Sequence, residues 1–159
     1  MTNYKGFTLV EILIVVIILG ILAAIVIPQF SAASNDARES SLVSDLQTLR
    51  SQLELYKVQH MDHYPNEVSA DDGETWAADT ANLEARLTGQ SDRFGQTTGT
   101  DFGPYLQKIP TNAFNGLASI EVSGTAGDSS AGWNFDAIDN KVQPDDAMAS
   151  PDGTPHTDL

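Results

Sequence analysis

The chain has 159 residues, with 22 acidic and 8 basic side chains, a formal net charge of −14 and no cysteine. This excess of carboxylates repels phosphate groups, so binding of nucleic acid is not expected. The absence of cysteine excludes a disulfide framework. The length beyond the N-terminal apolar segment suffices for one small domain and not for two.

The N-terminus changes abruptly from polar to apolar. Directly after Gly6, an apolar segment runs from Phe7 to Ile27 and contains one charged residue, Glu11. As a helix rising about 1.5 Å per residue it would span roughly 32 Å. The hydrocarbon core of a bilayer is about 30 Å thick, so the segment predicts a membrane-spanning helix. Lys5 favours a cytoplasmic N-terminus.

Two other interpretations of this segment explain less of the pattern. A secretory signal peptide would be cut near Ser31-Ala32-Ala33, but Glu11 lies where such a peptide is apolar, and the helical pattern continues through that site. A plain membrane anchor explains neither Gly6 nor Glu11. Neither interpretation accounts for the whole pattern.

The order lysine, glycine, phenylalanine, acid and apolar run resembles the N-terminus of type IV prepilins and of the pseudopilins of type II secretion. The resemblance implies that a prepilin peptidase cuts between Gly6 and Phe7 and methylates the new amine of Phe7. It also implies that Glu11 takes part in assembly, and that Gly20 and Pro28 soften the helix.

The physical reading of Glu11 agrees with this resemblance. A carboxylate within a membrane helix costs about 2.5–3.5 kcal/mol on insertion scales. No basic residue lies between Phe7 and Arg38, so the expected partner is the amine of Phe7 in a neighbouring subunit. The alternative remains open that Glu11 simply reaches the head-group layer from its place near the helix end.

An amphipathic helix is expected to continue beyond the apolar segment, with Pro28 bending it and not ending it. Apolar residues recur there at steps of four and three, which predicts one buried face. The residues of this stripe are Leu42, Leu46, Leu49, Leu53 and Tyr56.

The remaining chain, from about Met61, predicts a small domain. A short helix is expected from Asp72 to Leu87, a loop over 88–103, and strands over 119–122, 133–138 and 141–143. The expected fold class is α+β, a pilin-like long helix packed on a small antiparallel sheet. Gly103-Pro104-Tyr105, Asn112-Ala113-Phe114 and Gly132-Trp133 resemble, in their order, the landmarks of major pseudopilins.

Two groups of side chains suggest metal binding. His60 and His63 are spaced to share a metal, although such pairs are more often solvated. The segment Ser150 to Asp158 partly resembles the calcium loop of major pseudopilins, with Asp145, Asp146, Asp152 and Asp158 as the expected ligands and Gly153 at the turn. A frayed acidic tail is the alternative that stays open.

The resemblance as a whole implies three segments: a leader over 1–6, a membrane and filament-core helix over 7–30, and an amphipathic half-helix with its head over 31–159. The expected function is that of a structural, non-enzymatic pseudopilus subunit. It is held in the bacterial inner membrane and then assembled with identical subunits by an inner-membrane platform into a periplasmic or extracellular filament. A surface type IV pilin for adhesion or motility, and a tethered binding module that never polymerises, are the alternatives.

Overall fold

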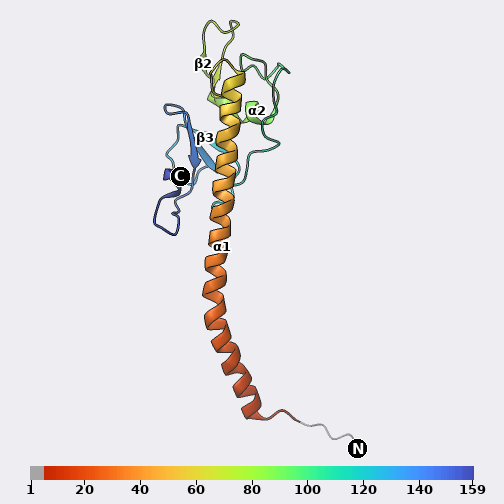
Figure 1. The fold of residues 1–159 in the computed structure, drawn as a ribbon, viewed down its shortest axis with the longest axis vertical. Coiled ribbons are helices and arrows are strands. Elements are labelled where there is room, and N and C mark those ends of the chain that lie inside the picture. Colours follow the sequence, from red (N-terminus) through yellow and green to blue (C-terminus); the bar gives the residue numbers. More distant parts are fainter. Residues whose placement is uncertain (1–5) are drawn as a thin grey trace, which may run out of the picture. The chain divides into compact units, whose positions relative to one another are not determined.

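The computed structural model describes residues 6–159, which divide into two compact units, one ending at Arg38 and the other spanning Glu39–Leu159. Residues 1–5 of the expected leader lie outside the described residues. Gly6, the last residue of that leader, is described. Figure 1 traces the chain from the N-terminal helix to the strands near the C-terminus.

A single helix, α1 (Leu9–Gln59), covers the apolar segment and the amphipathic stretch after it. It begins two residues after Phe7 and continues through Pro28, as the sequence predicts. In the first unit its large apolar side chains, from Leu9 to Ile27, are exposed. Among the described residues, α1 is the one helix that is long and apolar enough to cross a membrane.

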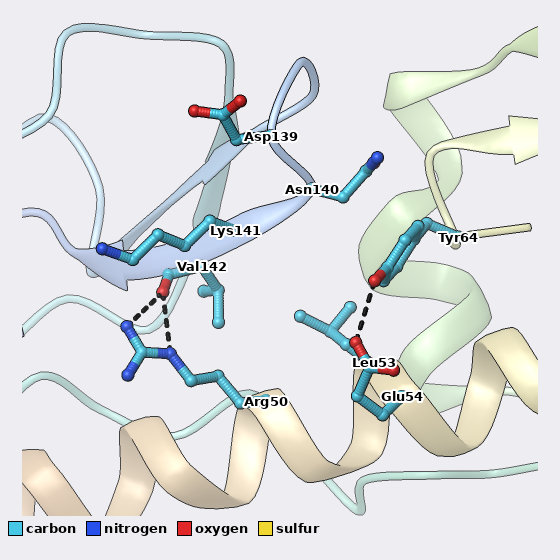
Figure 2. A pocket seen from close by; sticks show the side chains of 8 residues that line it. All are labelled: Arg50, Leu53, Glu54, Tyr64, Asp139, Asn140, Lys141 and Val142. Carbon is cyan, nitrogen blue, oxygen red and sulfur yellow. Dashed lines mark hydrogen bonds between the residues drawn. The ribbon is translucent and has the colours of Figure 1, made fainter.

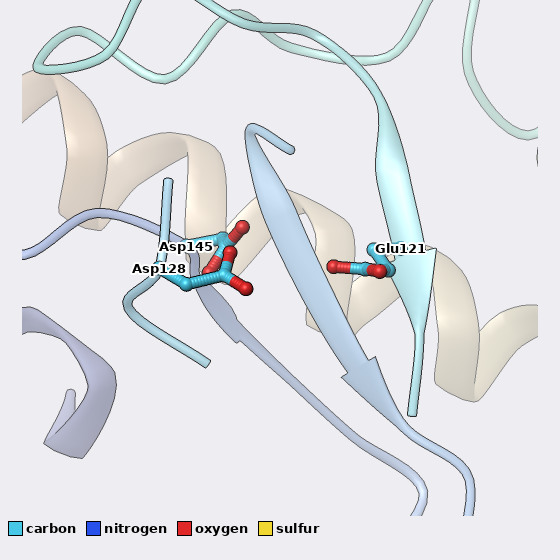
Figure 3. A group of neighbouring side chains, drawn as sticks. All are labelled: Glu121, Asp128 and Asp145. Carbon is cyan, nitrogen blue, oxygen red and sulfur yellow. The ribbon is translucent and has the colours of Figure 1, made fainter. Parts of the chain in front are cut away.

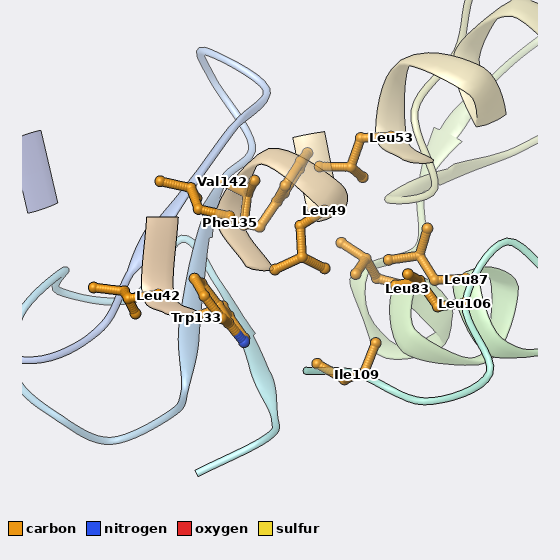
Figure 4. Close-up of a cluster of buried hydrophobic side chains, with 11 residues drawn as sticks. Leu42, Leu49, Leu53, Leu83, Leu87, Leu106, Ile109, Trp133, Phe135 and Val142 are labelled. Carbon is orange, nitrogen blue, oxygen red and sulfur yellow. The ribbon is translucent and has the colours of Figure 1, made fainter. Parts of the chain in front are cut away.

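In the second unit, α1 buries the predicted face. The stripe Leu42, Leu46, Leu49, Leu53 and Tyr56 is fully or almost fully buried. Leucines at these spacings lie on one side of a helix and so meet a common core. Figure 4 shows that they pack with side chains from α2, from the loop before β3 and from β4 and β5. Trp133 and Phe135 are the largest of these partners and are fully buried.

Two small sheets accompany the helix. The first pairs β1 (Glu67–Val68) with β2 (Ala77–Ala78) in antiparallel fashion and was not predicted. The second has the order β3 (Ile120–Val122), β4 (Trp133–Asp136), β5 (Lys141–Pro144), close to the predicted strands. The α+β layout is therefore as expected.

The expectation of a purely antiparallel sheet is wrong for one pair. β4 and β5 are antiparallel, but β3 pairs with β4 in parallel, with Ile120 opposite Trp133. A parallel pair needs a connection that returns the chain to the starting edge. Residues 123–132 provide this return.

The helix expected from Asp72 begins later than predicted. A 3₁₀ turn over Thr80–Asn82 leads into α2 (Leu83–Thr88), while Ala77–Ala78 form a strand. The Asp71 side chain accepts hydrogen bonds from Thr75 and Ser69, which fold residues 69–75 into a turn. These bonds compete with helix formation, as short polar side chains do near turns. The chain ends in a second 3₁₀ turn, His156–Asp158.

Candidate functional site

The junction between Gly6 and Phe7 lies in a non-helical, exposed segment just before α1. Thr8 stands at the start of the helix, where the Glu11 backbone N–H donates to its hydroxyl at 3.3 Å. In return, the Thr8 N–H and hydroxyl both lie 3.5 Å from Oε2 of Glu11. This reciprocal arrangement is a capping box. The bond at which cleavage is expected is thus accessible, and Glu11 has a partner, Thr8, at the start of its own helix.

Gly20 and Pro28 both lie inside α1. A methyl group added at Gly20 would contact nothing within 4 Å in this chain, so no contact inside the described chain requires a glycine there. Pro28 lacks the N–H that would complete the helical ladder. Neither residue is explained by packing within the described chain.

Three carboxylates from different parts of the second sheet approach one another. Glu121 on β3, Asp128 in the β3–β4 loop and Asp145 after β5 offer oxygens that all lie within 4.8 Å of one another (Figure 3). None of the ion pairs found in residues 6–159 includes any of the three. Hydrogen bonds from Ser130 lower the pKa of Asp128, which keeps it charged. Carboxylate oxygens are hard ligands of the kind that calcium or a similar cation binds.

The four predicted calcium ligands are not brought together. Asp145 alone belongs to the carboxylate cluster. It is buried and also accepts hydrogen bonds from the backbone N–H groups of Gly127 and Ala131. Asp152 is exposed and accepts from the Thr154 N–H, and Asp158 lies exposed in the terminal 3₁₀ turn.

The fourth, Asp146, lies in a different buried pair. Its Oδ1 is 2.6 Å from Nδ1 of His156, and its Oδ2 accepts from the Asn112 amide. His156 is fully buried and its ring packs against Phe114. The segment after β5 is therefore anchored and not frayed. The pair was not predicted, because an aspartate and a histidine ten residues apart form no recognisable pattern.

The two histidines that were considered for a shared metal have separate partners. His60 is buried, stacks on Tyr56 with ring centroids 3.6 Å apart, and places Nε2 3.0 Å from the Ser91 hydroxyl. Burial lowers its pKa, so it is neutral at physiological pH. His63 instead stacks on Trp76 and bonds to Glu67. His60 is thus a core residue and not a solvated one.

Arg86 anchors several loops and was also missed. Its guanidinium is buried and donates to the backbone carbonyls of Gly95, Pro65 and Asp79 and to the Asp79 carboxylate. Gly95 has a φ of 79°, and a side chain there would approach the Glu67 carbonyl to 3.0 Å. The absence of a side chain lets the loop carbonyl reach the arginine. The burial of Arg86 could not be predicted, because a charged residue within a predicted helix is usually taken to face solvent.

Comparison with known proteins gives two kinds of match. The prokaryotic N-terminal methylation motif matches residues 1–27. The type II secretion system core protein G of Dickeya chrysanthemi is 43% identical over 61 residues, 38% of this chain and 39% of that protein. Those of Klebsiella pneumoniae and Pseudomonas aeruginosa are 40% and 41% identical over 65 and 62 residues, covering 41% and 39% of this chain.

The matched part spans less than half the length of these relatives, 39% to 46%. No solved structure matches the chain. The resemblance drawn from the first residues of the sequence is confirmed by these matches.

Proposed function

We propose, from the premise that this chain carries the N-terminal segment of the type IV prepilin and type II secretion pseudopilin family, that it is the structural subunit of a pseudopilus. The observation that supports this most strongly is the coincidence of the methylation motif with an apolar helix segment that nothing in residues 6–159 covers. Such a surface needs a lipid environment or neighbouring helices. A filament core made of these segments provides the second.

The proposed course of assembly follows from the chemistry of the junction. A prepilin peptidase removes residues 1–6, which leaves Phe7 with a free amine at the start of the helix. The same enzyme then methylates that amine. Until then the subunit is held in the inner membrane by the apolar part of α1, with its N-terminus in the cytoplasm. The inner-membrane assembly platform then transfers it into the filament, outside that membrane.

Glu11 is proposed to receive the Phe7 amine of the neighbouring subunit. In the free chain its carboxylate makes long hydrogen bonds, 3.5 Å, to Thr8. These bonds are weaker than a charge-assisted contact of normal length. Glu11 therefore gains when it gives up its hydrogen bonds to Thr8 and accepts one from a positively charged amine. Gly20 and Pro28 are proposed to let the helix adapt to its neighbours in the filament.

Two other functions would use the same architecture. A surface type IV pilin would form long filaments on ordinary cells, and a tethered binding module would remain monomeric in the membrane. The relatives are named as core proteins of the type II secretion system, and this favours the pseudopilus. No catalytic role is proposed, since the relatives are named as core proteins of a secretion system.

Two measurements on the full chain, expressed in cells with a type II secretion system, test the proposal. The intact mass should correspond to a chain beginning at Phe7 with one added methyl group. Electron microscopy of sheared fractions should show filaments that contain it. A Gly6→Leu variant should keep its first residue and form no filaments. A parent chain that begins at Met1, or at Ala33, would overturn the proposed function.

A further inference from the structure

The backbone is strained where α1 ends. Met61 and Asp62 have φ angles of 57° and 72°, a left-handed conformation that residues other than glycine seldom adopt. Two hydrogen bonds close this corner: the Asp62 N–H donates to the Lys57 carbonyl at 3.0 Å, and the His63 N–H donates to the His60 carbonyl at 3.1 Å. Since two consecutive residues in this region are costly, contacts elsewhere must hold the corner in place.

The first side chain after this corner, His63, has two partners. Nδ1 of its ring lies 2.8 Å from Oε2 of Glu67 on β1. The ring also stacks on Trp76, with centroids 3.8 Å apart and planes 7° apart. Trp76 directly precedes β2, and β2 pairs with β1. These contacts therefore link the end of α1 to both strands of the first sheet.

Both partners of His63 favour the charged form of its ring. A carboxylate accepts a stronger hydrogen bond from an imidazolium than from a neutral imidazole. The face of an indole ring attracts a cation in the same sense. The side chains of His63 and Glu67 are 30% and 36% exposed, so solvent weakens this attraction without removing it.

The next residue, Tyr64, holds the same corner through contacts of another kind. Its hydroxyl donates to Oε1 of Glu54 on α1 at 2.8 Å (Figure 2). The Lys57 ammonium lies over the Tyr64 ring, 5.0 Å from its centroid. Carboxylates and ammonium groups ordinarily stay charged over the range in which a histidine changes its charge. A change of pH in that range therefore acts on this corner through His63.

The other charged groups near His63 do not oppose a positive ring. Of the ion pairs in residues 6–159, one includes His63, and its partner is Glu67. Lys57 on α1 is 3.6 Å from the Asp62 carboxylate. His60 is buried in the core against the Ser91 hydroxyl. The remaining charged residues on the segments beside His63 are acidic, namely Asp71, Asp72, Glu74 and Asp79.

We propose that protonation of His63 closes a clamp that holds β1, β2 and the turn between them to the end of α1. A histidine changes its charge between about pH 5 and pH 8. The charged ring binds Glu67 and Trp76 more strongly, and this additional stabilisation is lost as the pH rises and the proton leaves. The strained corner is then held less firmly, and the first sheet opens locally more often. The clamp lies within the head, so it does not depend on the proposed function.

Hydrogen exchange of the full, detergent-solubilised chain tests the clamp. Exchange is measured by mass spectrometry at about pH 5.5 and about pH 8 and corrected for the intrinsic effect of pH on exchange. Peptides covering residues 63–78 should be about two- to fivefold more protected at the lower pH, as expected for a partly exposed charge pair with a cation–ring contact. A parent chain with equal protection at both pH values would overturn the inference.

Three variants separate the clamp from a general effect of pH on stability. His63→Gln keeps an N–H donor for Glu67 but takes up no proton, so the pH difference in residues 63–78 should disappear. Glu67→Gln keeps an acceptor without its charge and should reduce the difference. Glu74→Gln removes an exposed acid of the same segment, outside the ion pair, and should retain it. A difference that persists in His63→Gln, or that Glu74→Gln also abolishes, would show that other groups are responsible.

Discussion

Asp146 and His156 form a buried pair that attaches the last residues of the chain to the end of β5. The distance from Oδ1 of the aspartate to Nδ1 of the histidine is 2.6 Å, and both side chains are almost completely buried. Asn112 and the Met148 N–H complete the hydrogen bonding of the carboxylate. The terminal segment, which was expected to be either a calcium loop or a frayed tail, is thus anchored to the core through His156.

Replacing His156 by alanine should destabilise the head strongly. The change leaves a buried carboxylate with one hydrogen-bond partner fewer, and a buried polar group that loses a partner typically costs about 1–3 kcal/mol, more where the group is charged. Urea unfolding of the detergent-solubilised chain, followed by the fluorescence of the buried Trp133, measures it. Asp152→Ala, at an exposed position in the same segment, should change stability by less than about 0.5 kcal/mol. A His156→Ala variant as stable as the Asp152 control would show that the pair has no such role.

Acid should weaken the contact between Asp79 and Arg86. The Asn82 amide, and then Arg86, hold the pKa of Asp79 below its ordinary value. A carboxylate with a lowered folded-state pKa stabilises the fold above its unfolded pKa of about 3.9, and this contribution is lost as the pH falls through the folded value. Asp79→Asn should therefore flatten the decline in melting temperature below pH 4. Asn82→Ala should flatten it partly. Parallel curves for the parent and Asp79→Asn would contradict this account.

Glu11 should be required for assembly and not for processing. In Glu11→Ala, the Phe7 amine of the neighbour would be left unpaired in an apolar core, so filaments should be scarce although cleavage is normal. Glu11→Gln should be nearly as defective, because an amide cannot neutralise the amine. Thr8→Ala removes the helix cap alone, at a cost of about 1 kcal/mol, and should assemble better than either. Immunoblots of sheared and cell fractions measure both steps. Normal yield from both Glu11 variants would refute the pairing.

Calcium should stabilise the head through Glu121, Asp128 and Asp145. Their mutual repulsion is relieved by a cation that their oxygens can coordinate. Millimolar calcium is expected to raise the melting temperature of the parent by a few degrees. Glu121→Gln should remove this response, whereas Asp152→Ala should retain it. If calcium has no effect on the parent, or if Asp152→Ala and not Glu121→Gln abolishes the response, the carboxylate cluster is not the site.

The local pattern of the sequence predicted the main helix and its buried face well. The stripe from Leu42 to Tyr56 is buried as its spacing indicates, because helical periodicity depends on residues three and four apart. The strands near Ile120, Trp133 and Lys141 were predicted because strand signals also depend on residues close together in the sequence. The methylation motif around Gly6 and Phe7 is equally local, so it too was recognisable without coordinates.

Contacts between distant residues were decided by the tertiary structure alone. The parallel pairing of β3 with β4 depends on the path of the connecting loop, which no strand pattern encodes. Arg86 is buried because carbonyls from three loops converge on it, and Asp145 joins Glu121 and Asp128 because the strands bring them together. Periodicity records which face of an element is apolar, and the partner of a polar side chain depends on where the rest of the chain folds. For this protein, therefore, the apolar helix segment and the methylation motif follow from the sequence, while the polar contacts of the head follow from its fold.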